Sequence, residues 1–175
     1  MLLALSSLLG APGGIPSFNR LLVRAASDFA KRRGFSLHVV ALTDQPGADP
    51  DFLSSLPQAV SPTYVACAGS RGRFAAEVLS QLGRESAAVL GHVNLSPLGL
   101  AFSRFGVIAH GTDVWTKLPT LRRWALRRAT VAAGVSEDTL NKLCDVQGVA
   151  RASCQRLVNA LDEASLALAD ATPST

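Results

Sequence analysis

The sequence predicts an α/β domain built on a doubly wound, mostly parallel sheet with helices on both faces. Short apolar segments bounded by turn residues alternate along the chain with amphipathic segments of helical period. This alternation is typical of β–α units wound into a single sheet. With 175 residues, of which 48% are hydrophobic, the chain can form one large domain with a substantial core.

Six segments are predicted to be strands because each is short, apolar and bounded by turn residues. They are residues 2–8, 36–42, 63–68, 87–92, 104–110 and 130–136. No Lys or Arg precedes Arg20, and the first apolar run is shorter than the roughly 20 residues that span a bilayer. We therefore interpret that run as a buried strand and not as a signal peptide or a membrane segment.

The clearest predicted helix begins at Pro16 and ends at Gly34, directly after three basic residues in its last turn. Its apolar face is expected to consist of Phe18, Leu21, Leu22, Ala25 and Phe29. Further helices are predicted over 74–83, 118–129 and 136–144. The segment 43–58 predicts a surface connection with room for one short helix, and the tail 167–175 is expected to fray.

The charge and the cysteines argue against several classes of protein. Seventeen basic and thirteen acidic residues give a net charge of +4, a small excess for a nucleic-acid-binding protein, so no nucleic-acid partner is expected. The three cysteines, Cys67, Cys144 and Cys154, form no CxxC pair and have no histidine at ligand spacing. We therefore expect no disulfide framework and no metal site, in a reduced cytoplasmic setting.

A glycine-rich segment, GAPGGIPSFN, separates the first strand from the first helix. At the carboxyl end of a parallel strand, such a segment lets backbone N–H groups and a helix N-terminus approach an anion, so Gly13 and Gly14 are candidates for a phosphate contact. It matches neither GxGxxG nor a Walker loop, which argues against dinucleotide or ATP binding. The other interpretation is a tight turn that needs positive φ, and the glycines taken alone slightly favour it.

Two more polar loops follow strands at the same edge of the predicted sheet. In GHVNLSP, His92 and Asn94 can face the crevice at that edge or cap the next helix. In HGTDVW, His110 can exchange a proton or a hydrogen bond near neutral pH, and Asp113 can orient a hydroxyl or cap the local turn. Trp115 is expected to cover the edge of the core. Three polar loops at one rim favour a shared site.

The predicted helix over 118–129 is strongly basic. The cations in or beside it, with no acidic residue among them, are Lys117, Arg122, Arg123, Arg127 and Arg128. Leu118, Leu121 and Ala125 share one face on a helical projection, and Arg123 and Arg127 point away from it. Like charges at this spacing cost a few tenths of a kcal/mol, which a membrane surface or an anionic acceptor would offset. A solvated helix face is the commoner explanation.

Taken together and in order, these motifs resemble the N-terminal half of a family-4 retaining glycosyltransferase of the GT-B fold. The matching segments, which cover nearly the whole chain, are GGIPSFNRLLVRAA, GHVNLSPLGLAF, FGVIAHGTDVW, LRRWALRRATVAAGVSEDTLNKL and RLVNALD. The resemblance implies a Rossmann-like domain that receives the acceptor and faces a second domain that binds a nucleotide-sugar donor. No cofactor is implied, because the nucleotide sugar is a substrate.

The resemblance implies roles for a few residues. Gly13 and Gly14 match the glycine loop near the donor phosphates, and His110 matches the strand-end histidine beside the transferred sugar. Asn159 matches the asparagine of the interdomain linker, although LVNALD lacks the usual preceding proline. The residues expected on the acceptor side of the cleft are His92, Asn94, Asp113 and Ser136.

The expected organisation is one domain over 1–160, followed by a tail or the start of a linker over 161–175, with the donor-binding domain and its ExxxxxxxE carboxylates absent. We therefore expect a hexosyltransferase domain that is inactive alone. Its partners would be a nucleotide sugar and a sugar or lipid-linked acceptor, in the cytoplasm or at the inner face of the membrane.

Two other hypotheses remain. The chain could be a non-catalytic module that docks a partner chain or forms a homo-oligomer through a bare cleft face. A small nucleotide-binding oxidoreductase is disfavoured, because the dinucleotide fingerprint is missing and the second strand does not end in an acidic residue in the usual place, for which Asp44 is the only candidate.

Overall fold

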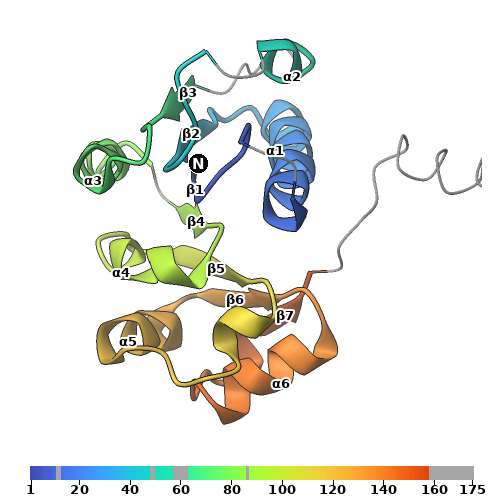
Figure 1. The fold of residues 1–175 in the computed structure, drawn as a ribbon, viewed down its shortest axis with the longest axis vertical. Helices are drawn as coiled ribbons and strands as arrows, with labels where there is room; N and C mark the ends of the chain where they lie inside the picture. Colours follow the sequence, from blue (N-terminus) through green and yellow to red (C-terminus); the bar gives the residue numbers. More distant parts are fainter. Residues whose placement is uncertain (11–12, 48–49, 57–62, 86, 158–175) are drawn as a thin grey trace, which may run out of the picture.

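The computed structural model describes residues 1–10, 13–47, 50–56, 63–85 and 87–157, and these form one seven-stranded parallel sheet in the order β3-β2-β1-β4-β5-β6-β7 (Figure 1). The strands are β1 Leu2–Leu5, β2 His38–Ala41, β3 Thr63–Ala66, β4 Ala88–Leu90, β5 Phe105–Ala109, β6 Val131–Gly134 and β7 Cys154–Arg156. The predicted α/β, doubly wound fold is confirmed. All six predicted strands are present within their segments.

Helices lie on both faces of this sheet. They are α1 Gly14–Arg33, α2 Pro50–Ser54, α3 Arg71–Leu79, α4 Ser96–Gly99, α5 Thr120–Arg128 and α6 Glu137–Asp145. Single 3-10 turns cover Val93–Leu95, Thr112–Val114 and Arg151–Ser153. Figure 1 shows α1 and α2 on one side of the sheet and α3, α4 and α5 on the other.

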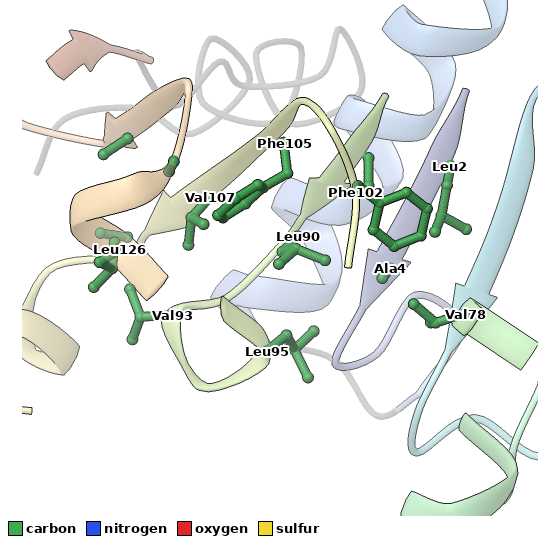
Figure 2. Packing of buried hydrophobic residues seen from close by; sticks show 14 of the residues in the cluster. Leu2, Ala4, Val78, Leu90, Val93, Leu95, Phe102, Phe105, Val107 and Leu126 are labelled. Atoms are coloured by element: carbon green, nitrogen blue, oxygen red, sulfur yellow. The ribbon is translucent and has the colours of Figure 1, made fainter. Parts of the chain in front are cut away.

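Alternate residues of the central strand supply two separate cores. Leu3 and Leu5 of β1 face α1 and α2, where the cluster also contains Val23, Val39 and Phe52. Leu2 and Ala4 face the opposite side, where Figure 2 shows them with Leu90, Phe105 and Val107 of the neighbouring strands and Val78 and Leu126 of α3 and α5. Because side chains alternate along a strand, β1 is buried on both faces and reads as a continuous apolar run.

The buried face of α1 differs from the predicted one. The buried residues are Asn19, Val23, Ala26, Ser27 and Ala30, most of them small, whereas Phe29 is 43% exposed. Small side chains bring the helix backbone close to the sheet, which moves the large apolar residues to the flank. Phe29 packs there against Phe35, with ring centroids 5.6 Å apart.

The expected apolar face of α5 is also partly wrong. Ala125 and Leu126 are buried against the sheet, whereas Leu121 is 57% exposed and Trp124 is 50% exposed. On a helix with 3.6 residues per turn, Leu121 and Trp124 lie one turn apart on the outer face. The outer face of α5 therefore combines apolar and basic side chains.

The strand order creates a crevice between β1 and β4. These two strands pair directly, through Leu2 with Ala88 and Ala4 with Leu90. The chain leaves β1 toward α1 on one face and leaves β4 toward α4 on the other (Figure 1). Such a switch point, at the carboxyl ends of the strands, is where open α/β sheets bind ligands.

Candidate active site

A buried carboxylate holds the loop after β1. Asp44, which follows β2, accepts hydrogen bonds from the N–H groups of Leu8 at 2.9 Å and Leu9 at 2.7 Å. The hydroxyls of Ser7 and Tyr64 donate to the same carboxylate, each at 2.7 Å. Burial and the hydrogen bond to Asp44 raise the pKa of Tyr64 well above its usual range, so its hydroxyl stays protonated. Asp44 thus shapes the crevice floor instead of binding a ribose.

Gly13 and Gly14 lie at the start of α1, beside the crevice. Gly13 is the N-cap with an extended φ of 175°, and neither glycine is among the residues with positive φ. A side chain at Gly14 would meet no atom within 4 Å. The interpretation of these glycines as a tight turn that needs positive φ is therefore not supported. What remains is an exposed helix start without a side-chain cap at Gly13, and the N-terminus of a helix is a geometry that suits an anion.

His110 leaves β5 and its ring lies between Phe18 and His92. The centroid of the His110 ring lies 5.0 Å from that of Phe18, in an edge-on arrangement, and 5.9 Å from that of His92, in a stacked arrangement. Nε2 of His110 lies 2.8 Å from the carbonyl oxygen of Gly91. Because a carbonyl only accepts, Nε2 is the donor in this contact. The orientation of the His110 ring is therefore fixed.

Gly91 allows this contact because it has no side chain. A Cβ atom there would lie 2.6 Å from Cδ2 of Leu5 and 3.4 Å from Oδ1 of Asn19. Asn19 itself donates through Nδ2 to the carbonyl oxygen of Ser7 at 2.6 Å. The ends of β1 and β4 and the first turns of α1 are thus packed against each other below the crevice.

Asp113 connects the two histidines. Its carboxylate accepts the backbone N–H of His110, with both oxygens 3.1 Å from that nitrogen. The chain folds back for this contact at Gly111, whose φ of 121° favours glycine. Oδ2 of Asp113 also lies 3.8 Å from Nε2 of His92. Asp113 is therefore a turn cap, as one interpretation predicted, and it also faces a histidine.

His92 is a neutral histidine in this cluster. Its Nδ1 accepts the backbone N–H of Asn94 at 3.1 Å, so Nε2–H is the proton-bearing side that faces Asp113. Burial lowers the pKa of His92, the Asp113 charge offsets part of this, and the neighbouring His110 and Arg122 add to the lowering. Near pH 7 the ring is therefore uncharged, with its Nε2–H on the side of Asp113.

A cavity of about 500 Å³ opens beside His92, between α3, α4 and α5; we call it the α3–α5 cavity. Its polar lining consists of Ser6, Arg71, His92, Asn94 and Arg122. Its apolar lining consists of Ile15, Leu42, Phe74, Ala75, Leu95, Pro97 and Leu98. Since Ile15 belongs to the first turn of α1, the cavity borders the helix end at Gly13 and Gly14.

The remaining predicted residues take other places. Ser136 caps α6, where its hydroxyl oxygen accepts the N–H of Thr139 at 3.1 Å, and it is absent from the lining of the α3–α5 cavity. Arg127 is exposed and Arg123 half-buried, both on α5 outside that cavity. Asn159 and the tail from 161 lie outside the described residues. Trp115 is 53% exposed and does not cover the core, contrary to expectation.

Sequence reasoning missed Arg71 as a site residue. It opens α3 directly after the GS turn that follows β3, at the same edge of the sheet as the three polar loops. The rule that selected those loops, polar residues after a predicted strand, applies equally to CAGSRGR. Arg71 could therefore have been found from the sequence.

The described ranges contain neither a candidate metal site nor a candidate membrane-spanning helix. No group of three or more His, Cys, Asp or Glu side chains in these ranges could hold a metal ion. None of the helices in the described part of the chain has the length and apolar character needed to span a bilayer.

A second hollow, of about 490 Å³, lies on the face of the sheet over β4, β5, β6 and β7. Its lining is largely apolar and includes Leu22, Val89, Ile108, Val131, Ala133 and Leu157. We call His92, His110 and Asp113 the histidine cluster. None of these three residues lines the second hollow, so the hollow is separate from the cluster. We call it the sheet-face hollow.

Comparison with known proteins gives a structural match. No protein-family model and no curated protein sequence significantly matches this chain. The structure of HepE from Anabaena in complex with UDP-glucose matches with a TM-score of 0.58 and 17% identity, over 92% of this chain and 43% of HepE. The HepE complex with UDP and glucose matches with a TM-score of 0.58 and 18% identity. The HepE complex with UDP matches with a TM-score of 0.54 and 16% identity.

At this low identity the match establishes the fold alone. The described chain shares the Rossmann-like α/β architecture of part of HepE and spans less than half of its length. HepE binds UDP-glucose, UDP and glucose in those structures.

Proposed function

We propose that this chain is the acceptor-side domain of a glycosyltransferase that moves a hexose from a nucleotide-diphosphate sugar to an acceptor. The finer assignment, to a family-4 enzyme of the GT-B fold that retains the anomeric configuration, rests on the order of the sequence motifs. The shared fold with HepE, which is solved with UDP-glucose, supports the nucleotide-sugar part of the proposal.

The observation that carries the proposal is the position of the histidine cluster beside the start of α1. His92, His110 and Asp113 follow β4 and β5, and Gly13 and Gly14 follow β1, so all lie at the carboxyl edge of adjacent strands. In this arrangement the N–H groups of the first turn of α1 meet the diphosphate and stabilise its charge as it leaves. His110, fixed by Gly91, positions the sugar.

The reaction breaks the bond between the anomeric carbon and the diphosphate oxygen and forms one to an acceptor hydroxyl. Neutral His92 adds a hydrogen-bonding group without placing positive charge next to the sugar. The α3–α5 cavity lies on the other side of His92 and has the size of a small-ligand site. Most of the donor binding is expected from a second domain, so UDP-glucose binding to these 175 residues should be weak.

NMR titration of the labelled chain with UDP-glucose tests this assignment. We expect weak binding, with shifts concentrated at the amides of Gly13, Gly14 and His110. The variant Gly14→Asp places a carboxylate at the anion site, where a side chain meets no atom, and should abolish those shifts while an acidic first turn favours the helix. Ser103→Asp, at an exposed position before β5 and so at the opposite edge of the sheet, is the matched control. Shifts elsewhere, or shifts that survive Gly14→Asp, would contradict the proposal.

We propose in addition that the outer face of α5 meets an anionic surface, such as the inner face of a membrane. Exposed Leu121 and Trp124 supply apolar contacts, and Arg127, three residues after Trp124, supplies charge beside them, whereas half-buried Arg123 lies farther round the helix. The guanidinium of Arg128 stacks 5.3 Å from the Trp124 ring. Peripheral membrane contact is thus a proposal with its own test.

The alternative function is a non-catalytic assembly module that self-associates or docks a partner chain. The sheet-face hollow favours it, because exposed apolar surface of this size promotes association. Light scattering over a wide range of protein concentration separates the two. Association that Val131→Lys abolishes, together with no UDP-glucose shifts, would favour the assembly module.

A further inference from the structure

The lining of the α3–α5 cavity contains basic side chains and no acidic ones. Arg71 and Arg122 line it, and no Asp or Glu does. No salt bridge in the described part of the chain involves either arginine. An arginine is charged at any physiological pH, so the cavity lining holds two cations and no carboxylate, while the nearby Asp113 carboxylate faces His92. Such a site favours a negatively charged ligand.

Arg71 is held at the cavity rim by a constrained loop. Ala68 has a left-handed φ of 52°, which is uncommon for a residue with a side chain. Its N–H donates to the carbonyl oxygen of Asp44 at 2.9 Å, and the N–H of Gly69 donates to that of Leu42 at 2.7 Å. The Ser70 hydroxyl then caps α3. The first turn of α3, with Arg71, is therefore fixed relative to β2.

Arg122 enters the cavity from the opposite wall. The buried Ser96 hydroxyl of α4 donates to the backbone carbonyl oxygen of Arg122 at 3.2 Å. Arg122 lies on the inner side of α5, next to buried Ala125 and Leu126, whereas Arg123 and Arg127 lie on the outer side. Its charge also acts on His92, whose pKa it lowers. Arg122 is thus separate in place from the proposed membrane-facing cations.

The rest of the lining sets the second property of the ligand. Seven of the twelve lining residues are apolar, and they come from the same walls as the arginines. An inorganic anion would leave this surface in contact with water, whereas an apolar group joined to the anion would cover it. We propose that the cavity binds an anionic group, phosphate or carboxylate, carried on an apolar body, and that this ligand is the acceptor. Its role as acceptor rests on the proposed function.

Binding of octyl phosphate to the full chain, measured by calorimetry below its micelle concentration, tests the inference. Octyl glucoside has the same tail without charge, and inorganic phosphate has the charge without a tail. We expect octyl phosphate to bind more tightly than either. Arg71→Gln and Arg122→Gln should each weaken its binding about tenfold, because a charge-assisted hydrogen bond is lost. Arg73→Gln is the matched control on α3, since Arg73 lines a different hollow.

Thermal unfolding of each variant checks that the fold is kept, and Leu98→Ser, at a partly buried position in the apolar wall, adds an independent probe that should weaken octyl phosphate more than inorganic phosphate. Equal binding of octyl glucoside, equal binding of inorganic phosphate, or unchanged binding in both arginine variants would overturn the inference. The octyl phosphate measurement needs no nucleotide-sugar donor, so the two proposals can fail separately. If UDP-glucose does not bind at Gly13 and Gly14 but octyl phosphate binds, the proposed function is wrong and the anion site remains. If UDP-glucose binds there but octyl phosphate does not, the anion site is wrong and the proposed function remains.

Discussion

The carboxylate of Asp44 lies 2.7 Å from the backbone nitrogen of Leu9 and accepts its N–H. This contact joins the end of β2 to the loop after β1, and the loop leads to Gly13 and Gly14. Asp44, which the sequence offered only as the candidate acidic residue of a dinucleotide-binding enzyme, therefore fixes the backbone beside the proposed donor site. Four of the donors around it are the N–H groups of Leu8 and Leu9 and the hydroxyls of Ser7 and Tyr64.

Replacing Asp44 by Asn should lower the free energy of unfolding by about 3 kcal/mol, because the new amide N–H₂ faces donors that lose their acceptor. Tyr64→Phe removes a single hydrogen bond and should cost about 1 kcal/mol. Urea unfolding measures both. The control Asp51→Asn, on the exposed surface of α2, should change stability by less than about 0.5 kcal/mol. Equal effects of Asp44→Asn and Asp51→Asn would refute the structural role.

The variant Asp113→Asn should lower the pKa of His92 further. The Asp113 charge, at 3.8 Å, raises that pKa against the effect of burial, and Asn removes the charge while an oxygen remains to accept the His110 N–H. NMR titration of the His92 ring is the measurement, with Asp138→Asn on α6 as control. A rise in the pKa, or none at all, would show that the two side chains do not interact.

Vesicles containing anionic lipids should bind the chain, and salt should weaken this binding. Arg123→Gln and Arg127→Gln should each lower the partition coefficient about fivefold, which corresponds to about 1 kcal/mol per cation near a charged surface. Trp124→Ser should lower it as well, whereas Phe29→Ser, an equally exposed apolar residue on α1, should not. Co-sedimentation that is insensitive to all of these changes would leave α5 as a solvated helix.

Oxidation should join Cys144 to Cys154. Their sulfur atoms lie 3.6 Å apart in a structure where all three cysteines are free. Diamide, which takes up the two thiol hydrogens, should reduce the titratable thiols from three to one and leave buried Cys67. Closing this short loop should stabilise the fold by about 2–3 kcal/mol against thermal unfolding. Cys144→Ser is the control, and covalent dimers in place of an internal bond would contradict the prediction.

Stability should fall as the pH drops below about 6.5, the ordinary pKa of histidine. Burial lowers the pKa of His38, partly offset by Glu85 and Glu77, and its Nε2 is buried without a partner. The unfolded chain therefore binds a proton more readily than the folded one in this window. His38→Leu should raise the free energy of unfolding by about 1 kcal/mol and flatten its pH dependence, as measured by urea unfolding at pH 7.5 and 5.5. His92 contributes with the same sign, so some slope should persist.

The strands and most helices were predictable from the sequence because burial on both faces makes each central strand a short apolar run. β7 was missed because Cys154–Arg156 is a short edge strand with exposed side chains. The buried face of α1 was wrong because hydrophobicity alone ranks Phe29 above Ala26 and Ser27, whereas close packing against a sheet selects small residues.

The site was predictable only as far as its edge of the sheet. The rule that polar residues after parallel strands converge brought His92, His110 and Asp113 together correctly. It could not separate a ligand contact from a cap, because Ser136 and Asp113 satisfy local N–H groups that depend on backbone geometry. Arg71 and Arg122 line the same cavity because α3 and α5 both pack near α4. This tertiary arrangement is not encoded in any local sequence pattern.

Gly91 belongs to the closely packed floor of the site, which is less tolerant of substitution than the cavity walls formed by α3 and α5. Its missing side chain seats β4 against Leu5 and Asn19, so a side chain here would force Leu5 to move, and its carbonyl oxygen meets His110. The groups expected to recognise the acceptor, Arg71 and Arg122, belong to α3 and α5 and line the cavity walls. Selectivity could therefore be reprogrammed at the walls, by evolution or by an engineer, while the reaction geometry is inherited unchanged.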